Sequence, residues 1–269
     1  MSVDSTGDPA ESRPRTGNPI LEIDGLVKRF GAFTAIDDVS MTVQDGEFRS
    51  VIGPNGAGKT TLFNLVSGAI PVTAGTVRFD GDDITSMSPE ERVRAGIGRS
   101  FQISNVFGGL TVRENVRLAA QSNHQDEYNI IESLFKTTDR YDDINVATER
   151  TLERIGLVDL AEVEANALAY GDRRRLEIGV VLAADPALVL LDEPTAGMSV
   201  EETRETIELI ESVLHDQTLL LIEHDIELVM ELSDRITVLN QGEVIAEGAP
   251  EMIASDQAVQ DAYLGGVVD

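Results

Sequence analysis

Residues 53–60 contain Gly53-Pro54-Asn55-Gly56-Ala57-Gly58-Lys59-Thr60, which matches the pattern G-x-x-x-x-G-K-[ST]. Glycine at the fixed positions lets backbone amides turn inward around a phosphate, because no Cβ atoms clash there. The residues before this turn, Phe48–Ile52, are typical of a strand, and those after it, Thr60–Ala69, are typical of a helix. The stretch therefore predicts a phosphate-binding loop that joins a strand to the positive end of a helix.

The chemistry of this P-loop assigns roles to its last residues. We expect the Lys59 ammonium to reach the β- and γ-phosphates and the Thr60 hydroxyl to ligate Mg²⁺. A glycine-rich turn with a surface lysine is the alternative, and the strand and helix on either side argue against it. The candidate nucleotide-binding loop comprises Gly53, Pro54, Asn55, Gly56, Ala57, Gly58, Lys59, Thr60 and Thr61.

An acidic pair follows a second apolar stretch. Asp192 and Glu193 come directly after Leu188-Val189-Leu190-Leu191, and open α/β sheets bind ligands at the carboxyl ends of their strands. Asp192 would hold Mg²⁺, directly or through water, and Glu193 would polarise the attacking water. Taken alone, such a pair is more often a helix cap or a turn. Together with the P-loop, the pattern favours catalysis.

Two further side chains are candidates on weaker grounds. His224 follows the apolar stretch Leu219–Ile222, so it is expected at the same sheet edge as Asp192, in contact with a γ-phosphate. A helix-start or core position is the alternative for this histidine. Gln102, within Arg99-Ser100-Phe101-Gln102, would contact Mg²⁺ or the water, although residue chemistry alone does not single it out.

The remaining pattern predicts an α/β fold. In the second half, apolar strands alternate with helices, which indicates a parallel sheet buried on both faces. The first half contains short alternating segments that predict a small antiparallel layer. The expected strands are Ile20–Ile23, Met41–Val43, Thr76–Phe79, Ala187–Leu191, Thr218–Ile222 and 235–239; the expected helices are Arg173–Ala184, one opening at Ser199 with Glu202 in a capping box, and 225–232. Thr111 and Glu114 have capping-box spacing at the start of a mostly helical region that extends to Leu168.

Composition excludes several classes of protein. The 269 residues include 48 acidic and 21 basic side chains, so the net charge is −27 and sequence-general binding of nucleic acid is disfavoured. There is no cysteine, which excludes disulfides and thiol chemistry. No apolar run approaches the ~18 residues that a membrane span needs, and Met1–Pro19 lacks a signal-peptide pattern. We expect an intracellular globular chain.

The basic residues are mostly arginine, and the acidic residues far outnumber them in parts of the chain. Lysine occurs only at three positions, whereas arginine occurs at eighteen, and between Glu201 and Asp234 eleven acids accompany only Arg204. At molar salt the Debye length falls to about 3 Å, so dense surface carboxylates hardly repel one another. The scattered carboxylates therefore favour a halophilic protein. An acidic protein in an ordinary cytoplasm is the alternative. The three lysines are Lys28, Lys59 and Lys136.

The order of these motifs resembles that of ABC-type ATPases. A P-loop, then Gln102, a glycine-containing motif before a helix, apolar-Asp-Glu-Pro and a strand-end His224 follow one another, and the resemblance extends from Ile20 to Gly265. Softer motifs are similar to those of the ATP-binding subunits of branched-chain amino-acid importers. These are Arg99-Ser100-Phe101-Gln102, Leu168-Ala169-Tyr170-Gly171, Arg174-Arg175-Leu176-Glu177-Ile178, Leu221-Ile222-Glu223-His224-Asp225 and Ala262-Tyr263-Leu264-Gly265.

The resemblance implies a fold and a domain organisation. The expected fold class is α/β, a P-loop NTPase with a mainly parallel core sheet, a small antiparallel β subdomain and an inserted α-helical subdomain at about 103–168. One ATPase domain would span 19–265, with a disordered tail at 1–18 and a short tail at 266–269. The implied ligands are ATP and Mg²⁺. Two such domains would pack head to tail and sandwich two nucleotides between them.

The same resemblance implies roles for individual residues. Phe30 matches the aromatic residue that stacks on adenine, although a plain core position would also suit it. Gln102 matches the residue that links the site to membrane subunits, Glu193 the general base, and His224 the switch histidine. The signature motif, which would face the nucleotide of a partner subunit, falls on Ala169, Tyr170, Gly171 and Asp172.

This chain departs from the family pattern within that motif. Leu168-Ala169-Tyr170-Gly171-Asp172 stands where Leu-Ser-Gly-Gly-Gln is usual, so Ala169 lacks the serine hydroxyl and Asp172 places a carboxylate toward the partner's triphosphate. We expect Asp172 to lower the activity of that composite site, unless high salt or Arg173–Arg175 screens the charge. Gly179-Val180 lacks a common arginine, and Ser199 replaces a usual Asp or Asn, which affects communication across the interface.

The implied function is that of the motor subunit of an importer. ATP binding would close a dimer of two ATPase subunits, identical or related, and hydrolysis would reopen it, driving separate permease subunits and, indirectly, a solute-binding protein. The chain would then lie at the cytoplasmic face of the membrane. The alternatives are the ATPase of a lipid or polysaccharide exporter, a mechanoenzyme outside transport, and a catalytically silent subunit; Lys59, Asp192, Glu193 and His224 argue against the last.

Overall fold

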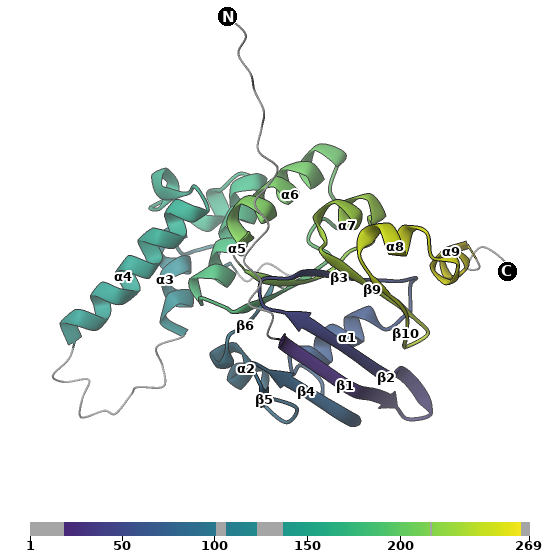
Figure 1. Ribbon diagram of the computed structural model, residues 1–269. Coiled ribbons are helices and arrows are strands. Elements are labelled where there is room, and N and C mark those ends of the chain that lie inside the picture. Colours follow the sequence, from purple (N-terminus) through teal and green to yellow (C-terminus); the bar gives the residue numbers. More distant parts are fainter. Residues whose placement is uncertain (1–18, 101–105, 123–136, 216, 265–269) are drawn as a thin grey trace, which may run out of the picture.

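The computed structural model describes residues 19–100, 106–122, 137–215 and 217–264, which form two sheets with helices between and around them (Figure 1). The smaller sheet is antiparallel where its strands pair, in the order β2-β1-β4-β5. This confirms the antiparallel layer, and its two long strands extend well beyond the alternating segments that predict them. Its strands are β1 (Pro19–Phe30), β2 (Phe33–Gln44), β4 (Ala74–Phe79) and β5 (Asp82–Asp83).

In the larger sheet, the carboxyl ends of the parallel strands form the edge at which a ligand is expected to bind. Its order is β10-β9-β3-β8-β7-β6, and all neighbours are parallel except β10, which runs antiparallel to β9. The predicted parallel sheet is therefore confirmed, while β6 and β10 are edge strands that the patterns above do not predict. Its strands are β3 (Phe48–Ile52), β6 (Ile97–Ser100), β7 (Leu188–Asp192), β8 (Thr218–Ile222), β9 (Arg235–Asn240) and β10 (Glu243–Gly248).

The helices largely follow their sequence signals. Both predicted capping boxes form: Thr111 and Glu114 bond each other's backbone amides, as do Ser199 and Glu202. One helix begins at Tyr170, three residues before the predicted start; its N-cap residue Ala169 makes no side-chain cap bond, so the sequence carries no capping signal for this start. The helices are α1 (Lys59–Val66), α2 (Pro89–Ala95), α3 (Val112–Ser122), α4 (Thr137–Arg154), α5 (Tyr170–Ala183), α6 (Val200–Leu214), α7 (Ile226–Leu232), α8 (Pro250–Ala254) and α9 (Gln257–Leu264).

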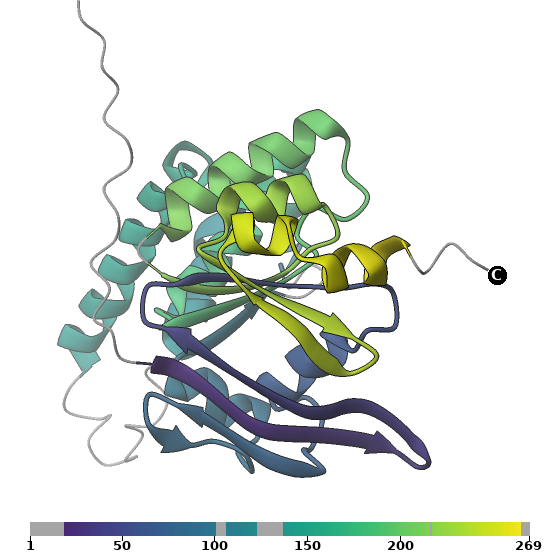
Figure 2. The same ribbon diagram turned by 45° about the vertical axis from the view of Figure 1, so that its right-hand side comes forward.

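Alternating side chains of the central strands build two cores, one on each face of the parallel sheet. Leu190 and Leu220 pack with α1 and the antiparallel sheet, whereas Val189 and Leu219 pack with residues of α3 to α6. Figures 1 and 2 show α1 between the two sheets and α5, α6 and α7 on the opposite side of the parallel sheet. Continuous apolar strands thus have both faces covered, as expected for a parallel sheet.

The C-terminal end of α1 is closed by a buried arginine. Arg92, on α2, donates through Nη1 to the carbonyls of Leu65 and Val66 at 2.6 and 2.7 Å, and through Nη2 to the carbonyl of Thr85 at 3.1 Å. Its side chain is almost completely buried. The last carbonyls of a helix have no partner within the helix, and a positive charge suits that end of its dipole. Arg92 therefore anchors the helix that follows the P-loop.

Some predictions fall on other parts of the chain. The predicted tails at 1–18 and 266–269, the residue Gln102 and most of the acidic stretch 122–143 lie outside the described residues. The limits of the ATPase domain and of the helical subdomain stay predictions. Within the described ranges, no helix combines the length and the apolar character needed to cross a bilayer.

Candidate active site

The P-loop leaves the end of β3 through backbone conformations that only glycine adopts easily. Gly53 has φ +150° and Gly58 has φ +106°. A Cβ atom at Gly53 would lie 2.0 Å from the Leu239 carbonyl oxygen, and one at Gly58 would lie 2.7 Å from the Ala35 oxygen. Neither position has space for a Cβ atom, so both require glycine. The predicted loop and the predicted helix after it are both present.

Lys59 is the first residue of α1 and turns its ammonium back into the loop. Its Nζ donates to the carbonyls of Gly53 at 2.7 Å and Pro54 at 3.2 Å, and its side chain is buried. Burial lowers the pKa of Lys59, because it disfavours the charged form, while the carboxylates of Glu193 and Asp192 oppose that effect. The ammonium therefore lies within electrostatic reach of both acids, as a phosphate-binding lysine should.

Asp192 ends β7 and presents a carboxylate oxygen without a hydrogen bond. Its Oδ2 pairs with Arg99 Nη2 at 3.3 Å, while its buried Oδ1 accepts no hydrogen bond among the described residues. Burial raises the pKa of Asp192, because it disfavours the charged form, and the Arg99 guanidinium opposes that effect. A bound divalent cation would satisfy the free oxygen and stabilise the carboxylate.

These observations fit the implied Mg²⁺. The described residues contain no cluster of three or more His, Cys, Asp or Glu side chains able to hold a metal. A Mg²⁺ here would rest on Asp192 and the exposed Thr60, with phosphate oxygens and waters completing its shell. That is the usual arrangement for a cation that arrives with a nucleotide. Gln102, the third predicted ligand, lies outside the described residues.

Glu193 and His224, the predicted general base and the predicted γ-phosphate contact, lie in contact with each other. His224 Nε2 and Glu193 Oε1 are 2.6 Å apart, although 31 residues separate them in the chain. Glu193 has φ +48°, in the left-handed region, and its amide donates to the Ile222 carbonyl at the end of β8. A non-glycine residue held in that conformation costs about 1–3 kcal/mol, and such strain concentrates at functional sites. The neighbouring ends of β7 and β8 bring the two side chains together.

Phe30 is not a core residue. Its side chain, at the end of β1, is 50% exposed, and the Lys28 ammonium lies 4.9 Å from the centre of its ring. The hairpin that carries Phe30 continues into Ala35, whose carbonyl lies against Gly58 of the P-loop. The exposure of Phe30 excludes the core alternative, and adenine stacking stays the prediction for this residue.

Two residues of the site go beyond the predicted set. Arg99 donates to Asn64 Oδ1 and Ser67 Oγ, both at 2.8 Å, in addition to its contact with Asp192, so it ties the P-loop helix to β7. Tyr263, on α9, forms a hydrogen bond with the backbone of Gly53; burial raises its pKa and that bond opposes the change. The sequence assigns neither residue a role of its own, because their long-range contacts have no local sequence signal.

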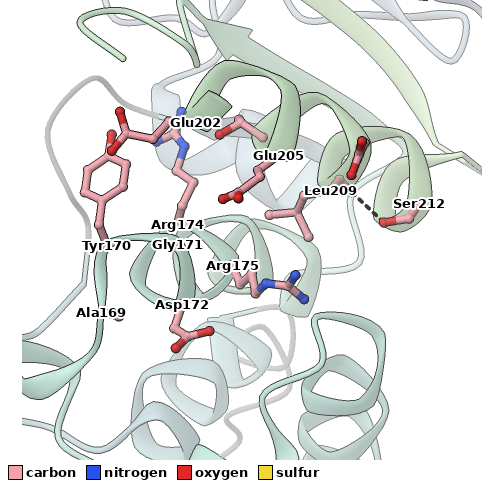
Figure 3. A pocket seen from close by; sticks show the side chains of 12 residues that line it. Ala169, Tyr170, Gly171, Asp172, Arg174, Arg175, Glu202, Glu205, Leu209 and Ser212 are labelled. Atoms are coloured by element: carbon pink, nitrogen blue, oxygen red, sulfur yellow. Dashed lines mark hydrogen bonds between the residues drawn. The ribbon is translucent and has the colours of Figure 1, made fainter. Parts of the chain in front are cut away.

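The signature residues line a separate groove between α5 and α6 (Figure 3). The groove measures about 700 Å³, and no P-loop residue lines it. Asp172 lies in the first turn of α5, and Figure 3 shows it pointing away from α6, whereas Arg174 extends toward that helix. The chain therefore does not bring Ala169, Tyr170, Gly171 and Asp172 to its own P-loop.

A loop with the P-loop pattern, a candidate metal-binding aspartate and a glutamate–histidine pair at one edge of a parallel sheet are the features of a P-loop nucleoside triphosphatase. Comparison of the sequence with protein-family models identifies the family. The family model described as "ABC transporter" matches residues 36–196, and that described as "Branched-chain amino acid ATP-binding cassette transporter" matches residues 243–269. The chain therefore belongs to the ATP-binding cassette family of ABC transporters, whose members hydrolyse ATP to power transport.

Curated relatives and solved structures agree with this assignment. The high-affinity branched-chain amino acid transport ATP-binding proteins LivG of Salmonella typhimurium and BraF of Pseudomonas aeruginosa are each 42% identical over 252 residues, covering 92% of this chain and 98% of theirs. The crystal structure of the ADP conformation of MJ1267, an ATP-binding cassette of an ABC transporter, matches with a TM-score of 0.76 and 31% identity. That match covers 92% of this chain and 99% of the other. The predicted family and fold class are confirmed.

Proposed function

We propose that this chain is the ATP-hydrolysing motor subunit of an importer for branched-chain amino acids. The observation that carries the proposal is the 42% identity to LivG and BraF over nearly their full length. The site described above supplies the chemistry that such a subunit needs. The match over residues 243–269 favours the importer over the exporter.

The residues of the chain divide the work of hydrolysis. The P-loop amides and Lys59 would bind the β- and γ-phosphates. The Lys59 ammonium would then donate its hydrogen bonds to phosphate oxygens in place of the carbonyls of Gly53 and Pro54. Thr60 and Asp192 would hold Mg²⁺, which supplies charge stabilisation to the transferring phosphoryl group when it is bound. Glu193 would take a proton from the water that attacks the γ-phosphorus, and ADP leaves with the bridging oxygen. His224 would keep the Glu193 carboxylate in place.

The working unit that we propose contains more than this chain. Ala169–Asp172 would face the nucleotide of a second ATPase subunit, identical or related, because they lie away from the chain's own P-loop. Permease subunits would dock near Gln102 and the helical region 103–168, and would place the chain at the cytoplasmic face of the membrane. A solute-binding protein would deliver the amino acid to the permeases.

The proposal is tested with the complex isolated from its own membrane through a tag on this chain. We expect two permease chains to co-purify, and vesicles containing the complex to take up labelled leucine when MgATP and a solute-binding protein are supplied. A Lys59→Ala complex is the matched control, which should assemble but not transport. Outward movement of lipid or saccharide, or MgATP hydrolysis without uptake of any branched-chain amino acid, would contradict the importer.

We also infer that the protein is adapted to high salt. Glu201, Glu205, Glu208 and Glu211 follow one another at spacings of three or four residues and are exposed on α6. Like charges at these spacings destabilise a helix by about 0.2–0.5 kcal/mol per pair. Among the described acids between Glu201 and Asp234, only Glu223 is buried.

Molar KCl is therefore expected to raise the free energy of unfolding by about 1 kcal/mol through α6 alone, and by more across the whole surface. Urea unfolding at low and at molar KCl measures this difference. An equimolar series with a non-ionic solute controls for effects unrelated to charge. Full stability at low salt, unchanged by KCl, would disprove the adaptation.

A further inference from the structure

A buried carboxylate lies directly behind the catalytic pair. Glu223 follows β8, and its side chain is only 4% exposed. Its Oε1 accepts hydrogen bonds from the Thr195 amide at 3.0 Å and from the Thr195 hydroxyl at 2.6 Å. Its Oε2 accepts from the His224 amide at 3.0 Å. Burying a carboxylate is costly unless such bonds compensate it, so the three donors explain how Glu223 is tolerated there.

These bonds close a ring around the candidate general base. Thr195 lies two residues after Glu193 in the turn that follows β7, and His224 is the neighbour of Glu223. Since the side chains of Glu193 and His224 are also in contact, the ring runs Glu193–His224–Glu223–Thr195 and returns through the backbone. The Glu193–His224 and Thr195–Glu223 contacts join the turn after β7 to the end of β8, and the bond between the His224 amide and Glu223 links the two contacts.

We propose that Glu223 is a positioning residue that holds the turn 193–195 and His224 in register, and thereby fixes the Glu193 carboxylate for catalysis. The proposal rests on the roles proposed above for Glu193 and His224. Glu223 does not touch the reacting atoms; it acts through Thr195 and through the backbone of His224. A shift of about 1 Å in a catalytic group can cost about 100-fold in rate.

The same turn is also held from the side of α5. Arg174 donates through Nη2 to the Pro194 carbonyl at 2.5 Å, and through Nη1 to Glu177 Oε2 at 2.6 Å. Pro194 lies between Glu193 and Thr195. Residues of α5 and of the end of β8 therefore form hydrogen bonds with three consecutive residues of the turn. The backbone of the turn 193–195 is therefore restricted from two sides. Removal of the Glu223 contacts should let the turn shift, and Glu193 with it.

Glu223→Gln tests the proposal. One amide oxygen cannot accept from both Thr195 and His224, and the amide nitrogen would face a donor. We expect kcat for ATP hydrolysis to fall about 10- to 100-fold, while KM for MgATP changes by less than about twofold. Glu231→Gln, the same substitution at an exposed position of α7, is the matched control. A kcat equal to that of Glu231→Gln would overturn the proposal.

A second pair of variants keeps the test valid if Glu223→Gln does not fold. Thr195→Ser keeps the hydroxyl that donates to Glu223, whereas Thr195→Val removes it at similar volume. We expect Thr195→Ser to retain nearly the full kcat and Thr195→Val to lose it with KM unchanged; equal rates for the two would overturn the proposal. Glu193→Gln separates a failure of the positioning role of Glu223 from a failure of the proposed function. Full hydrolysis by Glu193→Gln would refute the catalytic role proposed for Glu193 itself.

Discussion

Replacing Glu193 by Gln is expected to lower the rate of ATP hydrolysis by about 10²- to 10⁴-fold, which is the usual contribution of a general base. The glutamine side chain is nearly the same size, so the P-loop, Lys59 and Asp192 stay in place and nucleotide binding should persist. The contact of Glu193 Oε1 with His224 Nε2 at 2.6 Å supports this proposed role, because it would hold the carboxylate in one position. An enzyme that binds ATP without hydrolysing it should accumulate in its closed, nucleotide-bound form.

Two measurements check this result. Phosphate release from MgATP reports the rate, and size-exclusion chromatography in ATP reports whether two copies of this chain stay together. Glu201→Gln, an exposed carboxylate on α6, is the matched control and should hydrolyse ATP at the wild-type rate. If Glu193→Gln keeps more than about a tenth of the wild-type rate, its carboxylate is not the general base.

Replacing Arg92 by Met is expected to lower the free energy of unfolding by about 2–4 kcal/mol. A buried acceptor that loses its donor costs about 1–3 kcal/mol, and Arg92 supplies donors to the carbonyls of Leu65, Val66 and Thr85. Methionine fills much of the volume but donates nothing. Because α1 begins with Lys59, the loss should also loosen the P-loop.

Urea unfolding at constant salt measures the effect of Arg92→Met. Arg94→Met, an exposed arginine on the same helix, is the matched control and should change stability by less than about 0.5 kcal/mol. Equal losses for the two variants would show that the buried guanidinium does not hold the end of α1.

Local patterns predict the parts of this protein that depend on local physics. The P-loop, the strand before it and the capping boxes at Thr111 and Ser199 all depend on neighbouring residues, and all are confirmed. A further capping box, Ser88 with Glu91, opens α2 and carries the same signal, so that helix was predictable. The early start of α5 was not, since Ala169 gives no capping signal. The half-buried β10 does not alternate clearly.

Contacts between distant residues limited the prediction of the site. The sequence places Asp192, Glu193 and His224 at strand ends, and the rule for parallel sheets then brings those ends to one edge. Nothing local shows that Arg99 reaches Asp192 across 93 positions, or that Glu223 reaches Thr195 across 28. Such pairings follow from the register of β6, β7 and β8, which only the folded sheet fixes.

The P-loop is enclosed by parts of the chain that lie far from it in sequence. Leu239 crowds Gly53, Ala35 crowds Gly58, and the Gly242 amide donates to the Ala57 carbonyl at 2.9 Å. The conformational entropy of the loop is therefore lost when the chain folds and not when a nucleotide arrives. Affinity for the triphosphate thus depends on this preorganisation as well as on direct contacts, and a change in the β9–β10 hairpin can weaken binding without touching the ligand.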